Sequence, residues 1–313
     1  MAAPSPEPTL SAEAVLRRVE LQVARRLDGL LQGERRGRRP GPGGEAALTR
    51  PYQPGDDVRW VDWPLTARSP QVMVRVPELE PVLTAWALLD RSPSMDFGTR
   101  SQTKAALARE VLAGIGTVMR RRGDRLGVVA TGAGDLDLVL PPRADRRGLA
   151  GALRAIDRLP PSVAGARTDL AHAITALGRV ARHRGAVVIL SDLPLQPGLE
   201  GAIGALGRHH EVIAVEVRDP REREMPRLGA VRLRDMETGV TRLVDTADPR
   251  FQERFAAGVA AADAERAALL ARAGARHLVV ETGADWVAPL ARVLARPLRR
   301  RRPGGALPLG ASA

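Results

Sequence analysis

Short apolar strands alternate with helical segments from Pro81 onward, and this alternation limits the possible folds more than any other feature. The apolar run 82–89 ends at Asp90, as expected of a central parallel strand that is buried on both faces. A second apolar run, 186–190, leads to Asp192 in the same way. Strands that alternate with helices at this spacing predict a doubly wound α/β sheet with helices on both faces.

The other elements are predicted from their periodicity and from turn signals. We expect helices over 104–121, 146–159, 168–182, 249–273 and 285–298, strands over 125–131, 136–140, 211–217 and 277–281, and a hairpin over 231–245.

The chain is predicted to fold as four segments. Residues 1–32 form a disordered start and a helix, and residues 33–80 form a small, partly β region. Residues 81–298 make up the α/β domain, and residues 299–313 are a basic tail rich in Pro and Gly. In the β region, the valines at 72, 74 and 76 alternate, which predicts a strand with one buried face.

The absence of cysteine excludes disulfides, thiol nucleophiles, iron–sulfur clusters and cysteine-based zinc sites. The N-terminus has no signal-peptide pattern, and no stretch reaches the roughly 18 uninterrupted apolar residues that a membrane span needs. These observations predict a cytoplasmic protein.

The net charge of +12 comes almost entirely from arginine, because Lys104 is the only lysine. Clustered arginines attract phosphates, but this chain is also rich in Ala, Gly and Pro, as expected of GC-rich coding. Its densest basic runs, 35–39 and 296–302, lie outside the expected core, where charge runs are usually solvated. We therefore expect no nucleic-acid partner, although an arginine-rich nucleic-acid binder stays a weaker alternative.

Five oxygen-bearing side chains follow the predicted strands or begin a helix: Asp90, Ser92, Ser94, Thr168 and Asp192. The carboxyl ends of strands in an open α/β sheet lie at one edge, where ligands bind, so these side chains are expected to meet there. Hard oxygen donors suit Mg²⁺ or Mn²⁺. If the three hydroxyls bind the cation directly while Asp90 and Asp192 act mostly through waters, the cation stays electron-poor and can accept a carboxylate from another molecule.

Several segments match the pattern of a known family. They are RPYQPGDDVR at 50–59, VDW at 61–63 with TAR at 66–68, LDRSPSMDFG at 89–98 and GDRLG at 123–127. With these segments the chain resembles, over about residues 33–245, the Domain of Unknown Function 58 family, which contains a von Willebrand factor A-type domain.

The resemblance implies a Rossmann-like A-type domain, and a metal-ion-dependent adhesion site with a divalent metal at the five positions above. It also implies frequent genomic association with MoxR-type AAA+ ATPases that act as chaperones or assembly factors. One departure is Arg167 next to Thr168, where the family usually has small residues; its charge is expected to weaken cation binding.

We therefore predict a protein that is not an enzyme: a metal-dependent protein–protein interaction module, an adaptor or co-chaperone. Its expected partner is a MoxR-type AAA+ ATPase or the client of that ATPase, which would complete the metal's coordination with an acidic side chain. The basic net charge would speed the encounter with an acidic partner.

Most catalytic alternatives lack a required residue. A haloacid dehalogenase-type hydrolase needs a second aspartate where Ser92 stands, and a P-loop needs lysine after glycine, whereas Lys104 follows Thr103. There is no G-x-S-x-G elbow, and the histidines do not show H-E-x-x-H spacing. A Mg²⁺-dependent hydrolase of another kind stays an alternative.

The segment 55–68 belongs to the family pattern without an evident chemistry. One interpretation is structural: Asp56 or Asp57 caps the turn, and Asp62 pairs with Arg59 or Arg68. The other is a surface that binds a partner.

Overall fold

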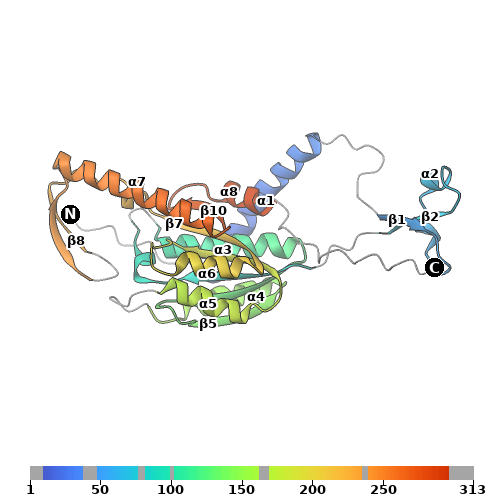
Figure 1. The fold of residues 1–313 in the computed structure, drawn as a ribbon, viewed down its shortest axis with the longest axis horizontal. Coiled ribbons are helices and arrows are strands. Elements are labelled where there is room, and N and C mark those ends of the chain that lie inside the picture. Colours follow the sequence, from blue (N-terminus) through green and yellow to red (C-terminus); the bar gives the residue numbers. More distant parts are fainter. Residues whose placement is uncertain are drawn as a thin grey trace, which may run out of the picture. The chain divides into compact units, whose positions relative to one another are not determined.

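The computed structural model describes residues 10–37, 48–76, 82–98, 102–161, 169–234 and 239–295 (Figure 1). The chain divides into two compact units, Met1–Arg26 with Leu83–Ala313 and Leu27–Val82, and each is described by itself. Helix α1 (Ala12–Gly37) begins in the first unit, so its first half belongs with the α/β domain. The described residues include no helix that is long and apolar enough to cross a membrane.

A six-stranded sheet forms the centre of the larger unit. Its strands, in order across the sheet, are β10 (Arg276–Glu281), β7 (His210–Arg218), β6 (Gly185–Ser191), β3 (Thr84–Asp90), β4 (Arg125–Thr131) and β5 (Leu138–Arg143). Every neighbouring pair is parallel except β4 with β5, which is antiparallel. Numbered along the chain, these strands follow the doubly wound order 3-2-1-4-5-6. The predicted α/β fold is confirmed.

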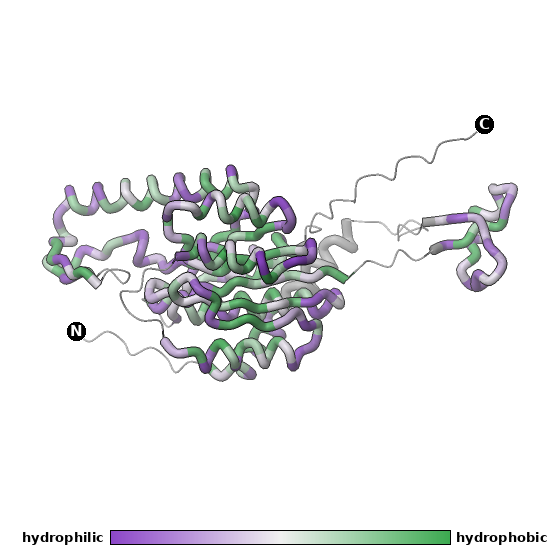
Figure 2. Tube along the Cα trace, turned by 60° about the horizontal axis from the view of Figure 1, so that its bottom comes forward, coloured by the Kyte–Doolittle hydropathy of each residue, from purple (hydrophilic) through white to green (hydrophobic). Residues whose placement is uncertain are grey.

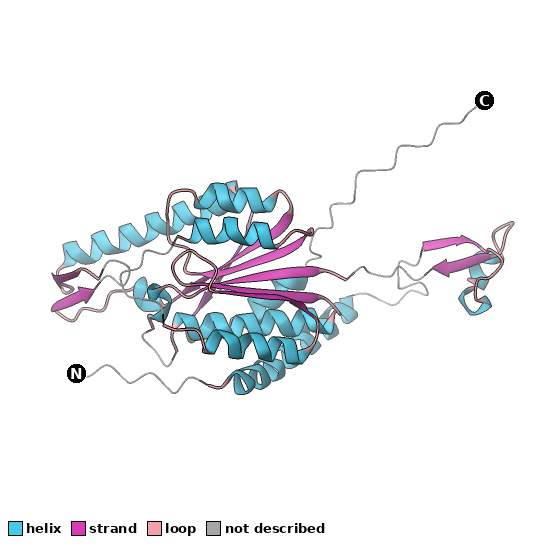
Figure 3. Ribbon diagram, turned by 90° about the horizontal axis from the view of Figure 1, so that it is seen from below, coloured by secondary structure: helices cyan, strands magenta, loops and turns pink. Residues whose placement is uncertain are grey.

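Helices cover both faces of this sheet (Figure 3). One face carries α5 (Leu170–Val180), α6 (Leu199–Gly207) and α7 (Pro249–Arg272), and the other carries α3 (Lys104–Arg121), α4 (Arg146–Asp157) and α8 (Val287–Ala295). Gly114 and Gly116 let α8 and α4 approach α3 closely, because a Cβ at either position would lie within 3 Å of Trp286 or Leu149.

The core lies between the sheet and these helices. Leu88, Ile174 and Ile189 are fully buried, and each such side chain stabilises the fold by about 1.5–3 kcal/mol. Figure 2 shows the strands of the sheet as predominantly hydrophobic, whereas hydrophilic residues lie mainly on the outer helices. The first half of α1 also packs on this unit: Leu16 and Val19 are fully buried.

Two elements differ from expectation for identifiable reasons. Strand β5 runs to Arg143 and includes Pro141 and Pro142, whereas the predicted strand ended at Leu140. Proline has no N–H to donate to a neighbouring strand. It is tolerated there because β5 is an edge strand, and one side of its backbone has no strand partner. Helix α6 was not predicted, since glycines dilute its apolar period.

The second unit is small. Strand β1 (Leu48–Pro51) pairs antiparallel with β2 (Met73–Val76), and a 3₁₀ turn, η1 (Val58–Trp60), and a short helix, α2 (Trp63–Thr66), lie between them. Val74 is 3% exposed, as the predicted buried face requires. Val72 instead precedes the strand and is 42% exposed.

Ion pairs hold this unit together. Asp56 accepts two hydrogen bonds of 2.7 Å from Arg50, and Asp57 caps η1 by accepting the N–H of Arg59. Asp62 pairs with Arg75 at 2.8 Å, so the prediction of a pair with Arg59 or Arg68 was wrong. The prediction failed because strand pairing brings Arg75, thirteen residues away, beside Asp62.

Candidate metal site

Asp90 is the last residue of β3, at the carboxyl edge of the sheet, and it is 1% exposed. Its Oδ1 accepts the backbone N–H of Ser92 at 2.8 Å. Its Oδ2 accepts the hydroxyl of Ser191, the last residue of the adjacent strand β6, at 2.5 Å. Both carboxylate oxygens are therefore held in fixed directions by neighbouring strand ends.

The electrostatic surroundings of Asp90 disfavour its charged form. Burial, and after it the nearby charge of Asp192, raise the pKa of Asp90 to about 6. The hydrogen bonds from Ser191 and Ser92 lower it, but by less. A buried carboxylate beside a second, partly buried one is an arrangement whose repulsion a bound cation would relieve.

Ser92 and Ser94 lie next to each other after the strand. Ser92 precedes the 3₁₀ turn η2 (Pro93–Asp96) and is 1% exposed. The hydroxyl oxygens of Ser92 and Ser94 are 3.0 Å apart. The turn thus places two neutral oxygen donors together, immediately beyond Asp90.

Asp192 follows β6, and its two oxygens differ. Oδ2 accepts a hydrogen bond of 2.8 Å from Lys104, whereas Oδ1 is buried without a hydrogen-bond partner among the described residues. A buried oxygen without a partner costs about 1–3 kcal/mol, more for a charged group. This oxygen is therefore available to a further group.

The backbone after Asp192 is strained. Leu193 is fully buried and adopts φ 53°, a left-handed conformation that is uncommon for a non-glycine residue. Its N–H donates to the Ser191 hydroxyl at 2.9 Å, and its carbonyl accepts from Arg266 at 2.9 Å. These two bonds hold the turn that directs Asp192, and such strain is concentrated at functional sites.

Lys104 completes the surroundings of Asp192. It is the first residue of α3, is 1% exposed, and contacts Glu222 at 2.6 Å as well as Asp192. Burial alone would lower the pKa of Lys104, but the charges and hydrogen bonds of Asp192 and Glu222 outweigh it and leave the pKa above its ordinary value. The ammonium therefore stays charged.

The structure brings together four of the five predicted site residues: Asp90, Ser92, Ser94 and Asp192. Thr168 lies outside the described residues. Sequence reasoning did not give a role to Ser191, Lys104 or Glu222. Lys104 could have been found from composition, because it is the only lysine.

The donor set is suited to a hard divalent cation. Within the described residues, no three His, Cys, Asp or Glu side chains gather as a metal cluster, so a purely carboxylate or imidazole site is not formed there. The oxygens of Asp90, Ser92, Ser94 and Asp192 instead combine two charges with two neutral hydroxyls. Mg²⁺ prefers oxygen donors and retains water or external ligands, which fits a set with so few protein charges.

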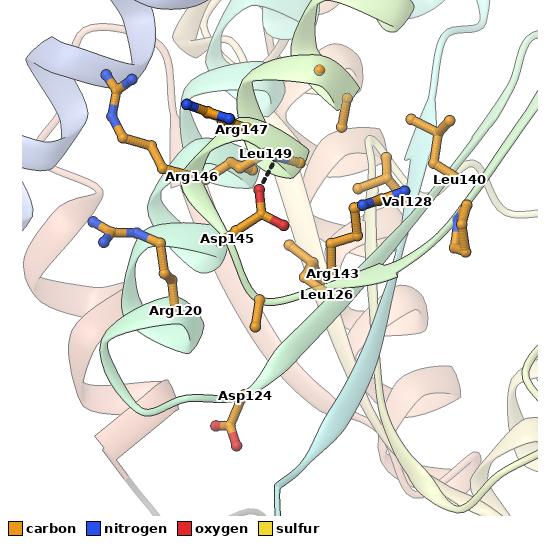
Figure 4. Close-up of a pocket in the computed structure, with 16 residues that line it drawn as sticks. Arg120, Asp124, Leu126, Val128, Leu140, Arg143, Asp145, Arg146, Arg147 and Leu149 are labelled. Atoms are coloured by element: carbon orange, nitrogen blue, oxygen red, sulfur yellow. Dashed lines mark hydrogen bonds between the residues drawn. The ribbon is translucent and has the colours of Figure 1, made fainter.

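A separate cavity of about 800 Å³ lies between α3, β4, β5 and α4. Leu126, Val128 and Leu149 contribute apolar walls, and Arg143 and Arg147 are among the charged residues that line it (Figure 4). Leu126 stands near the start of β4, so this cavity is at the amino edge of the sheet, opposite Asp90. It is no part of the candidate metal site.

The strand order defines a doubly wound α/β domain, with a cluster of oxygen-bearing side chains at the carboxyl edge of its sheet. Residues 48–265 match the family described as protein of unknown function DUF58, and the chain belongs to that family.

Curated relatives cover nearly the whole chain. Uncharacterized protein Rv1480 of Mycobacterium tuberculosis (strain ATCC 25618 / H37Rv) is 41% identical over 288 residues, which are 92% of this chain and 90% of that protein. Uncharacterized protein Mb1516 of Mycobacterium bovis has the same identity and coverage.

Solved structures are more distant. BatB from Bacteroides thetaiotaomicron matches with a TM-score of 0.40 at 15% identity, covering 68% of this chain and 97% of its own. The SpRpn10 VWA domain matches with a TM-score of 0.36 at 11% identity, covering 68% of this chain and 95% of its own.

Proposed function

We propose that this protein is a metal-dependent protein–protein interaction module, and that its site of Asp90, Ser92, Ser94, Thr168 and Asp192 holds Mg²⁺ or Mn²⁺. The observation that carries the proposal is the buried Oδ1 of Asp192, which has no hydrogen-bond partner among the described residues and stands near the buried Asp90. A divalent cation would satisfy that oxygen and relieve the repulsion between the two carboxylates.

The donor chemistry favours docking over catalysis. Ser92 and Ser94 offer neutral hydroxyls, and the Lys104 ammonium already pairs with Asp192, so the protein neutralises the cation only partly. A cation in such a site attracts a further anionic ligand, and a glutamate or aspartate side chain of another protein is a suitable one. Residues after the strands would hold the metal and leave one position for that ligand.

The partner we propose is a MoxR-type AAA+ ATPase or its client protein. The family resemblance supports this choice, and the sequence has no P-loop of its own. The ATPase would supply ATP hydrolysis, and this protein would recognise the client. It would therefore act as an adaptor or co-chaperone in the assembly or maturation of other proteins.

Metal binding is tested by calorimetric titration of the full chain with Mg²⁺ and Mn²⁺. We expect weak binding in the wild type and none in Asp90→Ala, with circular dichroism showing that the variant stays folded. Equal affinity in Asp90→Ala would contradict the proposed site.

Partner binding is tested by pull-down with the MoxR-type ATPase of the same genome, with and without EDTA at fixed ionic strength. If the metal holds the complex, EDTA and Ser92→Ala should each abolish capture. Capture that is indifferent to EDTA, to Asp90→Ala and to Thr168→Ala would contradict the metal-bridged mechanism. Loss in moderate salt without a chelator effect would show that the net charge alone is responsible.

A further inference from the structure

The only lysine of the chain is buried at the candidate metal site. The sequence has 48 lysines and arginines, and Lys104 is the single lysine among them. Its side chain is 1% exposed and contacts the carboxylates of Asp192 and Glu222. Where arginine is used almost everywhere else, a compact ammonium at this position indicates a requirement for a point charge that a planar guanidinium does not meet.

Lys104 and the proposed metal would share one carboxylate. The ammonium holds Oδ2 of Asp192 at 2.8 Å, while Oδ1 of the same group is buried and has no hydrogen-bond partner among the described residues. Glu222 holds the other side of the ammonium at 2.6 Å. Asp192 is thus oriented by a fixed cation on one oxygen and is open to a second cation on the other.

The backbone segments that carry Lys104 and its partner Glu222 are both capped by hydrogen bonds. Thr103 caps α3 by accepting the N–H of Ala106, which fixes the start of the helix that carries the lysine. Glu222 ends the 3₁₀ turn η3 (Pro220–Glu222), where a capping box with Asp219 orders the backbone. The ammonium therefore cannot move away easily when a cation enters.

We infer that Lys104 is a built-in competitor cation that limits the affinity of the site for divalent metal, so that metal is held firmly only when an acidic ligand supplies the missing negative charge. This inference rests on the proposed metal site and specifies how that site is regulated. Lys104 is a positioning residue for Asp192, since it would act on the metal through that carboxylate and through its own charge.

Two effects of Lys104 on metal affinity oppose each other. Orienting Asp192 favours binding, and outer contacts of this kind contribute roughly 10- to 100-fold in metal affinity. Repulsion between a buried ammonium and a divalent ion disfavours binding, and in a site with little water it is the stronger effect because the product of the charges is two. Removal of the charge should therefore tighten binding.

The same charge couples metal to ligand. An acidic side chain that joins the metal adds the negative charge that Lys104 cancels, so metal and acidic ligand should bind cooperatively. Without the Lys104 charge, the metal would bind firmly in the absence of a ligand, and the protein would lose the coupling.

The test measures Mn²⁺ binding alone, by electron paramagnetic resonance of free Mn²⁺ with the full chain. We expect Lys104→Met to bind Mn²⁺ at least about tenfold more tightly than the wild type. Lys104→Arg keeps the charge, and its larger guanidinium does not fit the same space, so this variant should bind Mn²⁺ no more tightly than the wild type. The double variant Lys104→Met with Glu222→Gln removes the pair without leaving Glu222 uncompensated, so it gives the same test if the single variant does not fold.

Arg146→Met is the matched control for net charge. Arg146 begins α4 on the amino side of the sheet, near the register pair Leu126 and Arg143, and its partners are Glu13 and Glu20. The Arg146→Met substitution removes one positive charge from the same unit and leaves the contacts of Asp192 unchanged. We expect its Mn²⁺ affinity to match the wild type.

The outcomes separate the inference from the proposed function. If Asp90→Ala abolishes binding while Lys104→Met binds no more tightly than the wild type, the metal site stands and the inference is overturned. An equal gain in Lys104→Arg or in Arg146→Met also overturns it, because the effect would not depend on the charge beside Asp192. If the wild type and every variant fail to bind, both fail together. Binding by Lys104→Met alone, abolished by adding Asp90→Ala, supports the inference in its strongest form.

Discussion

Replacing Asp90 by asparagine is expected to stabilise the metal-free protein at neutral pH. Burial and the charge of Asp192 raise the pKa of Asp90 from 3.8 to about 6 in the folded state. The folded protein therefore binds more protons than the unfolded chain between these pH values, so the free energy of unfolding falls as the pH rises from about 4 through 6. Asparagine has no charge to bury, so the free energy of unfolding of the variant should not fall in this way.

The magnitude follows from the shift and from the bonds that asparagine retains. At 1.36 kcal/mol per unit, the shift corresponds to about 3 kcal/mol above pH 7. The asparagine oxygen can still accept the N–H of Ser92, and its amide can donate to Ser191. Exchanging charged for neutral hydrogen bonds costs about 1 kcal/mol, so the net gain is about 2 kcal/mol.

Urea unfolding in EDTA, followed by far-ultraviolet circular dichroism from pH 5 to 8, measures the effect. The difference between Asp90→Asn and the wild type should be small at pH 5 and should reach its full value above pH 7. Asp145→Asn is the matched control, because asparagine keeps the cap that Asp145 provides to α4. Added Mg²⁺ should stabilise the wild type and leave Asp90→Asn unchanged.

Two results would refute this reasoning. A destabilised Asp90→Asn at pH 7 would show that the carboxylate is fully compensated by its hydrogen bonds. A stabilisation that does not change between pH 5 and 8 would show that it does not come from the buried charge.

Two further substitutions, one at a helix cap and one in the packing of the sheet, are tested by the same urea measurement. Thr103→Ala removes the side chain that accepts the Ala106 N–H at the start of α3, and it should lower the free energy of unfolding by about 1 kcal/mol, whereas Thr103→Ser should not. Gly127→Ala places a Cβ 2.5 Å from the ring of Trp86 and should cost about 1–3 kcal/mol; an unchanged stability would show that the ring moves freely.

The regular elements of the α/β unit could be predicted from the sequence because their patterns are strong. The predicted bounds of α3 and β4 agree with the structure at both ends, and β6 differs by one residue at each end. Buried parallel strands are short apolar runs, and helices between them show one apolar stripe. These local patterns are enough to predict a doubly wound sheet.

Weak local signals explain what was missed. The sequence of α6, LEGAIGALG, contains three glycines, and its helix is stabilised by tertiary burial of Leu199, Ile203 and Leu206. Gly198 precedes it with φ 82°, a conformation that suits glycine. In the second unit, the partner of Asp62 depends on the bridge between Val61 and Val74, which no local pattern shows.

The part of the candidate site that lies at the ends of the strands could be predicted from the sequence. Asp90 and Asp192 follow neighbouring strands of the sheet, so topology alone brings them together, and Ser92 and Ser94 follow within the same turn. The hydroxyl of Ser191 could not be assigned in this way, because a strand residue points to one face or the other according to register. Only the structure shows that it meets Asp90.

Lys104 shows the limit of arguments from spacing. It stands fourteen positions after Asp90 in the sequence and at the start of a helix, so nothing in its spacing indicates a contact with Asp192, eighty-eight residues further on. Composition was the better guide. Coding bias toward arginine acts on every basic position, and a position that keeps lysine against it is one where the two side chains differ in effect. The buried ammonium between Asp192 and Glu222 supplies that difference, since a point charge there can attenuate a second cation on the same carboxylate without filling the space that the cation would need.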